Sequence, residues 1–297
     1  MPSRRFRPLP KMATIPSRDL ELSLLKDAEN RYGQGSVLPD PLASVPPLQM
    51  RCVGGIDEVG RGAIAGPLAV GVAVIDGTEG EPPAGLTDSK QLTPRRREAM
   101  FDELSAWPAA WAVGMASAEE IDEEGLTPAL RLAAFRALKA LGEQGFSPRL
   151  LLLDGSFDYL SAPTDLFAGA NVDQSASSAD QLAPAASASS QAEIPREVTT
   201  VVKGDGKSVV IAAASVLAKV TRDRLMSDLS DPGYGWAKNK GYASAQHLQA
   251  IAQLGLDSSH RLSWHLQGVS SAAFARAWRI RREKRVQPPL VFSTQKG

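Results

Sequence analysis

The sequence predicts an α/β domain built on a mixed sheet, and three observations lead to that fold class. Residues 53–56 and 68–75 are apolar runs joined by a glycine-rich turn, which predicts an antiparallel hairpin. Later apolar runs at 110–116, 150–153 and 198–202 alternate with segments of helical pattern, as in sheets flanked by helices. The hydrophobic content, 43% of 297 residues, is sufficient for a sizeable core.

Capping signals define the expected helices. Thr93 followed by Pro94 is an N-cap with proline at the first helical position, and the helix should run to about residue 104. Thr127 and Pro128 repeat this signal, and Gly142 should end that helix. Further helices are expected at residues 19–32, 211–229 and 244–254.

Composition divides the chain into three parts. Residues 1–49 are expected to be an N-terminal extension, largely disordered, and residues 50–268 the folded domain. Residues 269–297 form a basic C-terminal helix or tail. Within the domain, residues 161–195 are dominated by Ala, Ser, Asp and Gln, which predicts a low-complexity insertion that loops out.

Charge and cysteine content exclude several classes of protein. Basic and acidic residues balance at 33 each, so no global charge points to a partner. The single cysteine, Cys52, rules out an internal disulfide, and with only three histidines a Cys/His zinc module is excluded. No apolar run approaches a membrane span and no secretory signal is evident. We therefore expect a cytoplasmic monomer, with any metal held mainly by carboxylates.

Acidic residues stand at or just after three apolar strands. They are the pair Asp57 and Glu58, then Asp154, then Asp205. Any one alone is explained equally well as a helix cap or turn residue. Strands laid side by side would bring these acids together, and their mutual repulsion favours bound Mg²⁺ or Mn²⁺. Such a cluster suits two-metal phosphoryl transfer or phosphodiester hydrolysis.

Two lysines accompany these acids. The segment 203–208 (Lys-Gly-Asp-Gly-Lys-Ser) lacks the first glycine of a Walker phosphate loop, so Lys203 is interpreted as a phosphate contact beside a metal-binding acid, or as part of a solvated turn. Lys90 ends an Asp-Ser-Lys turn that either holds a phosphate or simply precedes the next helix.

Aromatic and basic residues alternate in residues 234–242, a composition typical of nucleic-acid contacts. His260 and Arg261 either contact phosphate or complete the fold. Asp223 is a rival metal-binding acid, although an ion pair on its helix explains it as well.

A series of motifs in this order resembles bacterial ribonuclease HII: Gly-Ile-Asp-Glu-Val-Gly-Arg-Gly (55–62), Asp-Ser-Lys (88–90), Leu-Asp-Gly (153–155), Lys-Gly-Asp (203–205), the run 211–226, Lys-Gly-Tyr (240–242) and His-Arg (260–261). The resemblance implies an RNase H-like fold, with a mixed five-stranded sheet flanked by helices and a helical C-terminal part. It implies an endonuclease that hydrolyses the RNA strand of RNA–DNA hybrids and cuts at ribonucleotides embedded in duplex DNA. Two metals, Mn²⁺ or Mg²⁺, would leave 5′-phosphate and 3′-hydroxyl ends.

The resemblance also implies roles for individual residues. The metal-binding catalytic acids would be Asp57, Glu58, Asp154 and Asp205. Gly60, Arg61 and Gly62 resemble the turn that senses the ribose 2′-hydroxyl, and Tyr242 resembles the tyrosine that touches it and stacks on the next sugar. The long 161–195 insertion and the N-terminal extension depart from the family pattern. Two alternatives remain open: a non-catalytic nucleic-acid-binding module, and another metal-dependent nuclease or strand transferase of the same fold.

Overall fold

The computed structural model describes residues 15–32, 50–161, 196–264, 266, 269–283 and 291–293. Of the N-terminal extension expected at 1–49, only the stretch 15–32 is therefore described. The low-complexity insertion expected at 161–195 lies outside the described residues except for its first position.

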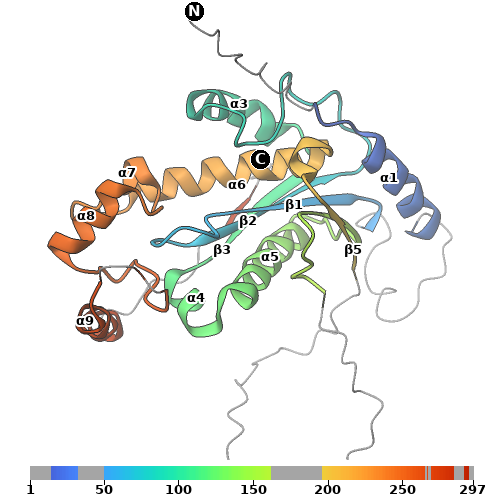
Figure 1. The fold of residues 1–297 in the computed structure, drawn as a ribbon. Coiled ribbons are helices and arrows are strands. Elements are labelled where there is room, and N and C mark those ends of the chain that lie inside the picture. Colours follow the sequence, from blue (N-terminus) through green and yellow to red (C-terminus); the bar gives the residue numbers. More distant parts are fainter. Residues whose placement is uncertain are drawn as a thin grey trace, which may run out of the picture.

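The strands are β1 (Val53–Val59), β2 (Leu68–Ile75), β3 (Ala110–Ala116), β4 (Leu150–Asp154), β5 (Glu197–Val201) and β6 (Val291–Ser293). In the described part of the chain they form one mixed sheet of six strands in the order β5-β4-β1-β2-β3-β6 (Figure 1). β2 pairs antiparallel with β1 and β3, and β3 with β6, whereas β4 runs parallel to β1 and β5. β1 therefore joins an antiparallel and a parallel half of the sheet, and the mixed α/β architecture predicted from the sequence is confirmed.

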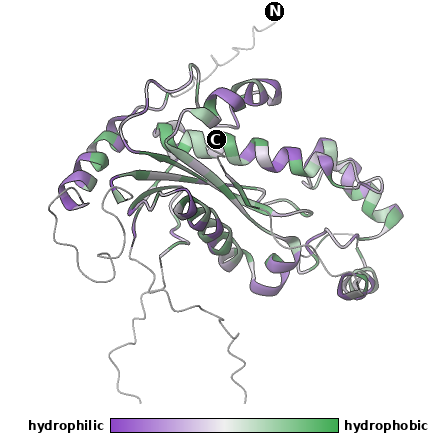
Figure 2. Cartoon of the chain, turned by 180° about the vertical axis from the view of Figure 1, so that it is seen from behind, coloured by the Kyte–Doolittle hydropathy of each residue, from purple (hydrophilic) through white to green (hydrophobic). Residues whose placement is uncertain are grey.

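Helices cover both faces of the sheet. On one face lie α1 (Asp19–Tyr32), α3 (Pro94–Ala106) and α6 (Val209–Asp228), and on the other α4 (Ala118–Glu124) and α5 (Leu126–Glu143) (Figure 1). Each face has its own apolar core, because alternate strand residues point to opposite sides. In Figure 2 the central strands are coloured apolar and the flanking helices carry hydrophilic residues toward solvent. No described helix has the length and apolarity of a membrane span.

Two glycines allow α6 to lie unusually close to the sheet. A Cβ at Gly71 of β2 would lie 2.5 Å from the carbonyl oxygen of Ala214, and one at Gly55 of β1 would lie 2.5 Å from the backbone carbon of Val210. Any larger residue would push α6 away, since contacts this short do not occur. The close approach places the first turns of α6 directly over β1.

A third apolar cluster forms the helical C-terminal part. It combines α7 (Trp236–Asn239), α8 (Ala245–Leu254) and α9 (Ser271–Glu283) with the end of α6. The rings of Tyr234 and Trp236 stack at a centroid distance of 5.2 Å, and His260 packs edge-on against Tyr234 at 4.7 Å. These aromatic residues are core residues.

The structure corrects several expected boundaries. β1 continues past residue 56 to Val59, because β2 supplies antiparallel partners along its whole length. α5 begins at Leu126 and ends at Glu143, so Thr127 is not its cap and Gly142 lies inside it. α6 begins two residues before 211.

Several short elements were not predicted, among them β6 and α4. The sheet has a sixth strand, because the three residues of β6 are too few to give a sequence signal. α4 was missed although its Ser117 and Glu120 form a capping box.

Candidate active site

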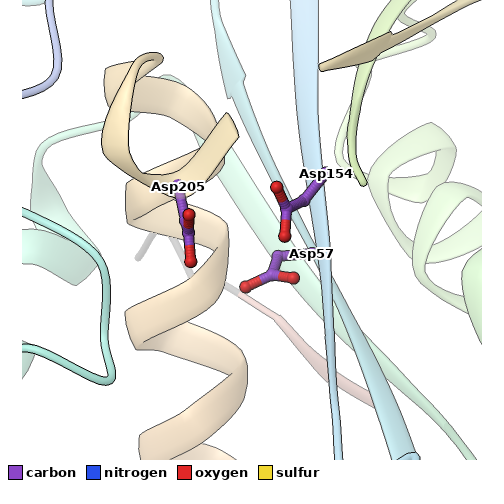
Figure 3. Close-up of side chains that lie close together, drawn as sticks. All are labelled: Asp57, Asp154 and Asp205. Carbon is purple, nitrogen blue, oxygen red and sulfur yellow. The ribbon is translucent and has the colours of Figure 1, made fainter. Parts of the chain in front are cut away.

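Three aspartates from separate elements meet beside α6. Asp57 lies in β1, Asp154 is the last residue of β4, and Asp205 lies in the 3-10 turn η2 (Gly204–Gly206) that precedes α6. One carboxylate oxygen from each lies within 4.8 Å of the other two. Figure 3 shows the three side chains directed toward a common space.

Strand register accounts for two of the three positions. Ile56 of β1 pairs with Leu153 of the parallel strand β4, so the residues that follow, Asp57 and Asp154, project from the same face. The third acid is tied to them through the backbone, because the amide of Gly204 donates to Oδ1 of Asp154 at 2.6 Å. Sheet pairing and one turn hydrogen bond thus assemble the cluster.

Glu58 lies next to this cluster. Its carboxylate faces the guanidinium of Arg61 at 3.6 Å and is not one of the three mutually close groups. Burial raises the pKa of Glu58; Arg61 opposes this effect and Asp154 adds to it. Glu58 therefore feels the charge of the cluster from its edge.

Burial and like charge make the cluster difficult to ionise in full. Burial raises the pKa of Asp57 to about 8, with added repulsion from Asp154 and Glu58 and an opposing hydrogen bond from Ser215. Burial, then repulsion from Asp154 and Asp88, raises the pKa of Asp205 to about 6. Nearby positive charge would relieve both effects.

The donor set fits a hard divalent cation. All three groups are carboxylates, and Cys52, the single cysteine, is buried. Oxygen ligands of this kind favour Mg²⁺ or Mn²⁺ over zinc. Asp57, Asp154 and Asp205 are the residues that could hold such an ion.

Lys90 is the lysine that reaches the acids. Its Nζ lies 3.4 Å from Asp205, and its side chain is 75% exposed. Burial opposes its charge, but Asp57 and Asp205 outweigh that effect and raise the pKa of Lys90. Lys203 precedes η2 in a left-handed conformation (φ 57°), with an exposed side chain. Lys90 thus contacts an acid of the cluster, Lys203 directly precedes the turn that carries Asp205, and both lysines are exposed to solvent.

The Gly-Arg-Gly turn directly follows β1 and is held by buried arginines. Arg261 donates to the carbonyl oxygens of Gly60 and Arg61 at 2.6 and 2.7 Å. Gly60 has φ 80°, and a Cβ there would lie 2.1 Å from Nε of Arg222, so glycine is required. Contacts with Arg261 and Arg222, both buried, therefore fix the conformation of the turn.

Tyr242 lies close to the same turn. The carbonyl oxygen of Gly241 accepts hydrogen bonds from Ile64 and Ala65, just after the turn, at 2.9 and 3.1 Å. The Tyr242 ring is 37% exposed, and the guanidinium of Arg222 lies 5.7 Å from its centroid. A partly exposed aromatic residue therefore follows the backbone segment that is hydrogen-bonded to residues 64 and 65, just after the turn.

Most of the folded part of the chain matches one known family. The family model described as Ribonuclease HII matches residues 54–145 and 161–267. A Ribonuclease HII of Streptomyces avermitilis is 43% identical over 216 residues, which cover 72% of this chain and 77% of that protein. The chain belongs to the ribonuclease HII family. A family protein of Ruegeria sp. is also 43% identical, over 71% of this chain and 77% of its own.

Membership in the ribonuclease HII family establishes the class of reaction. The chain is a hydrolase, an endonuclease that acts on RNA in RNA–DNA hybrids, as the sequence resemblance implied. Similar solved structures include the ribonuclease H2 of Pyrococcus horikoshii, 24% identical with a TM-score of 0.47, covering 78% of this chain and all of that one. Another is Bst-RNase HIII in complex with Mn²⁺, 18% identical with a TM-score of 0.46, covering 84% and 76%.

The structure decides between the alternatives for several residues of this ribonuclease HII. Tyr234 and Trp236 are buried, so they are not open stacking platforms as their composition suggested. Arg261 is fully buried and supports the turn instead of meeting a phosphate. Asp223 pairs with Lys219 at 2.8 Å and lies outside the aspartate cluster.

Two serines make contacts that sequence reasoning did not assign to them. The hydroxyl of Ser215 in α6 hydrogen-bonds Asp57 and lies 2.8 Å from the hydroxyl of Ser89. Ser89 belongs to the Asp-Ser-Lys turn, so this chain of hydroxyls connects that turn to the cluster. A serine within an alanine-rich helix is a weak signal, although Ser215 lies on the same helix face as Ile211, one turn earlier.

Proposed function

We propose that this ribonuclease HII cuts at single ribonucleotides embedded in duplex DNA as well as in longer hybrids. Two neighbouring devices support the proposal, the aspartate cluster and the turn at residues 60–62. Only one residue, Val59, separates Glu58 from Gly60. An enzyme that examines one sugar where it cuts needs no long run of RNA.

In this mechanism Asp57, Asp154 and Asp205 hold the metal, and Glu58 completes the ligand set from the edge. One or two bound Mg²⁺ or Mn²⁺ ions would supply an activated water and a counter-charge for the leaving 3′-oxygen, leaving 5′-phosphate and 3′-hydroxyl ends. Lys90, beside Asp205, and Lys203 bind the phosphates that flank the scissile bond.

Selection of the sugar falls to the turn and the aromatic ring. The backbone of Gly60, Arg61 and Gly62 offers polar groups to the 2′-hydroxyl, which distinguishes RNA from DNA at one nucleotide. Tyr242 contacts the same hydroxyl and stacks on the next sugar. Because Arg261 and Arg222 hold this region rigidly, a sugar without the hydroxyl would leave polar groups unpaired.

We also propose that the enzyme acts as a cytoplasmic monomer, with duplex nucleic acid as its partner. The three aspartates converge within a single chain, so the proposed metal site needs no carboxylate from a second copy. A molar mass of one chain by light scattering at working concentration is the expected result; a stable dimer would contradict it.

The decisive assay uses three duplexes, with zero, one or four ribonucleotides in one strand. The wild type with Mn²⁺ or Mg²⁺ should cut the second and third and leave the all-DNA duplex intact. Asp57→Asn should abolish both cuts, since it removes a carboxylate of the cluster. Equal cutting of all-DNA substrate would favour a general nuclease, and unchanged cutting by Asp57→Asn would refute the proposed site.

A further inference from the structure

The first helix carries a buried carboxylate that is directed at the start of α6. Glu21 of α1 is fully buried. Its Oε1 accepts hydrogen bonds from Oγ of Ser208 at 2.6 Å and from the backbone amide of Val210 at 3.0 Å. Its Oε2 has no protein partner in the described part of the chain, so Glu21 holds α6 through Oε1.

A second contact joins the same two segments. The amide of Ser17, just before α1, donates to the carbonyl oxygen of Lys207 at 3.0 Å, in a short parallel bridge. The segment that begins α1 therefore binds residues 207 and 208 twice, through the backbone amide of Ser17 and through the side chain of Glu21. α1 packs on the core through Ala28 and Tyr32, so these contacts connect the start of α6 to an element fixed against the sheet.

The electrostatic setting favours this arrangement. The first amides of a helix lack intrahelical partners and carry a partial positive charge. Glu21 satisfies the amide of Val210, and Ser208, the N-cap, satisfies the amide of Ile211 at 3.2 Å. A carboxylate at this position makes charge-assisted hydrogen bonds, which are stronger than neutral ones.

Asp205 is the acid that depends most on this contact. Asp57 and Asp154 are held by pairing with Gly71 of β2 and Val201 of β5, whereas Asp205 lies on a three-residue turn between β5 and α6. That turn is held on one side by Asp154 through Gly204, and on the other by Ser208, whose amide donates to the carbonyl of Gly204 at 2.8 Å. Glu21 acts on this second support.

We propose that Glu21 is a positioning residue: by holding Ser208 and the first turn of α6, it keeps Asp205 in place to bind metal. α1 precedes the segment that the family model matches, yet it is part of the working unit. The inference rests on the proposed role of Asp205 as a metal ligand.

The test measures Mn²⁺ binding to the full chain by calorimetry without substrate. Glu21→Ala should weaken binding by about tenfold or more, as expected for a residue that supports a metal ligand. Glu21→Gln keeps an acceptor for Ser208 and Val210 and should restore part of that loss. Ser208→Ala removes the hydroxyl that donates to Glu21 and caps the amide of Ile211, and it should weaken binding in the same direction. Glu29→Gln, on an exposed part of the same helix, is the matched control and should bind as wild type.

A double variant separates positioning from general stability. If Glu21 acts through Asp205, adding Glu21→Ala to Asp205→Asn should cause no further loss of Mn²⁺ affinity. A lower melting temperature with unchanged Mn²⁺ affinity in both Glu21→Ala and Ser208→Ala would overturn the inference while leaving the proposed function intact. Unchanged affinity in Asp205→Asn alone would overturn both.

Discussion

Arg261 donates a hydrogen bond to the carbonyl oxygen of Gly60 at 2.6 Å, across 201 positions of sequence. The arginine is completely buried, and its guanidinium also reaches the carbonyl oxygens of Arg61 and Gly66. One side chain from the C-terminal part therefore fixes the turn that follows β1. In the ribonuclease HII family fold, the proposed ribose sensor is held by a residue far from it in the chain.

Arg261→Lys should weaken both stability and sugar selection. Lysine keeps the charge but cannot reach all three carbonyl groups, so the free energy of unfolding should fall by about 1–3 kcal/mol. The value of kcat/KM on a duplex with one ribonucleotide should fall as well. Arg224→Lys, at an exposed pair with Glu98, is the control and should change little. A lower melting temperature with full kcat/KM would show that Arg261 does not serve selection.

Tyr242→Ala should reduce cleavage at a single ribonucleotide by roughly ten- to hundredfold, because an exposed ring that stacks on a sugar or base contributes about 1–3 kcal/mol. Tyr242→Phe keeps the ring and loses the hydroxyl, so it separates stacking from the contact to the 2′-hydroxyl. Steady-state kinetics on duplexes with one and four ribonucleotides measure both effects. Equal rates for wild type and Tyr242→Ala would contradict the proposed contact of Tyr242 with the substrate.

The metal-free protein should lose stability as pH rises. The pKa of Asp57 moves from 3.8 to about 8 on folding, so between these values the folded state binds more protons than the unfolded state. Stability is then greatest below about pH 4 for this group and declines toward pH 8. Urea unfolding in EDTA at several pH values should show the decline, of order a few kcal/mol.

Two controls test whether the aspartate cluster causes this dependence. Asp57→Asn removes the titrating group and should flatten the profile between pH 5 and 8. Saturating Mn²⁺ should reverse the trend, because metal binding requires the ionised carboxylates. A wild-type profile that stays flat in EDTA would contradict the charge distribution described for the site.

Gly71→Val should destabilise the fold by about 3 kcal/mol or more, because the added side chain meets the backbone of Ala214 in a packed interface. Gly142→Ala is the contrasting change. It lies inside α5 with open space around it, so alanine should stabilise the protein by up to about 1 kcal/mol. Thermal unfolding of the two variants should move in opposite directions.

Local sequence predicts what local physics determines. Asp57, Asp154 and Asp205 could be found because each stands at or after an apolar strand, and strand ends gather in a mixed sheet. Their convergence in space agrees with that reasoning. The predicted hairpin of β1 and β2 and the predicted N-cap of α3 by Thr93 are likewise confirmed.

Contacts between residues far apart in the chain could not be predicted from the sequence. Glu21 and Arg261 are polar residues whose burial depends on segments far away in the chain, and their neighbours in sequence do not distinguish them from surface residues. For Tyr234 and Trp236 the sequence-based prediction was wrong: the flanking lysines and glycines indicated exposed rings, whereas both residues are buried. Composition reports what a segment contains, whereas burial depends on what packs against it.

The position of β1 has a consequence for the order in which the enzyme becomes competent during synthesis. Its antiparallel partner β2 follows within a few residues, but its parallel partner β4 emerges only near residue 150, and Asp205 later still. When β1 and β2 have been synthesised, β4 and the turn that carries Asp205 have not, so Asp57 is then without the other two aspartates. No product of translation that stops before residue 205 carries all three aspartates, and none that stops before residue 261 carries the support of the Gly-Arg-Gly turn. A chain truncated before either position therefore lacks part of the site proposed above.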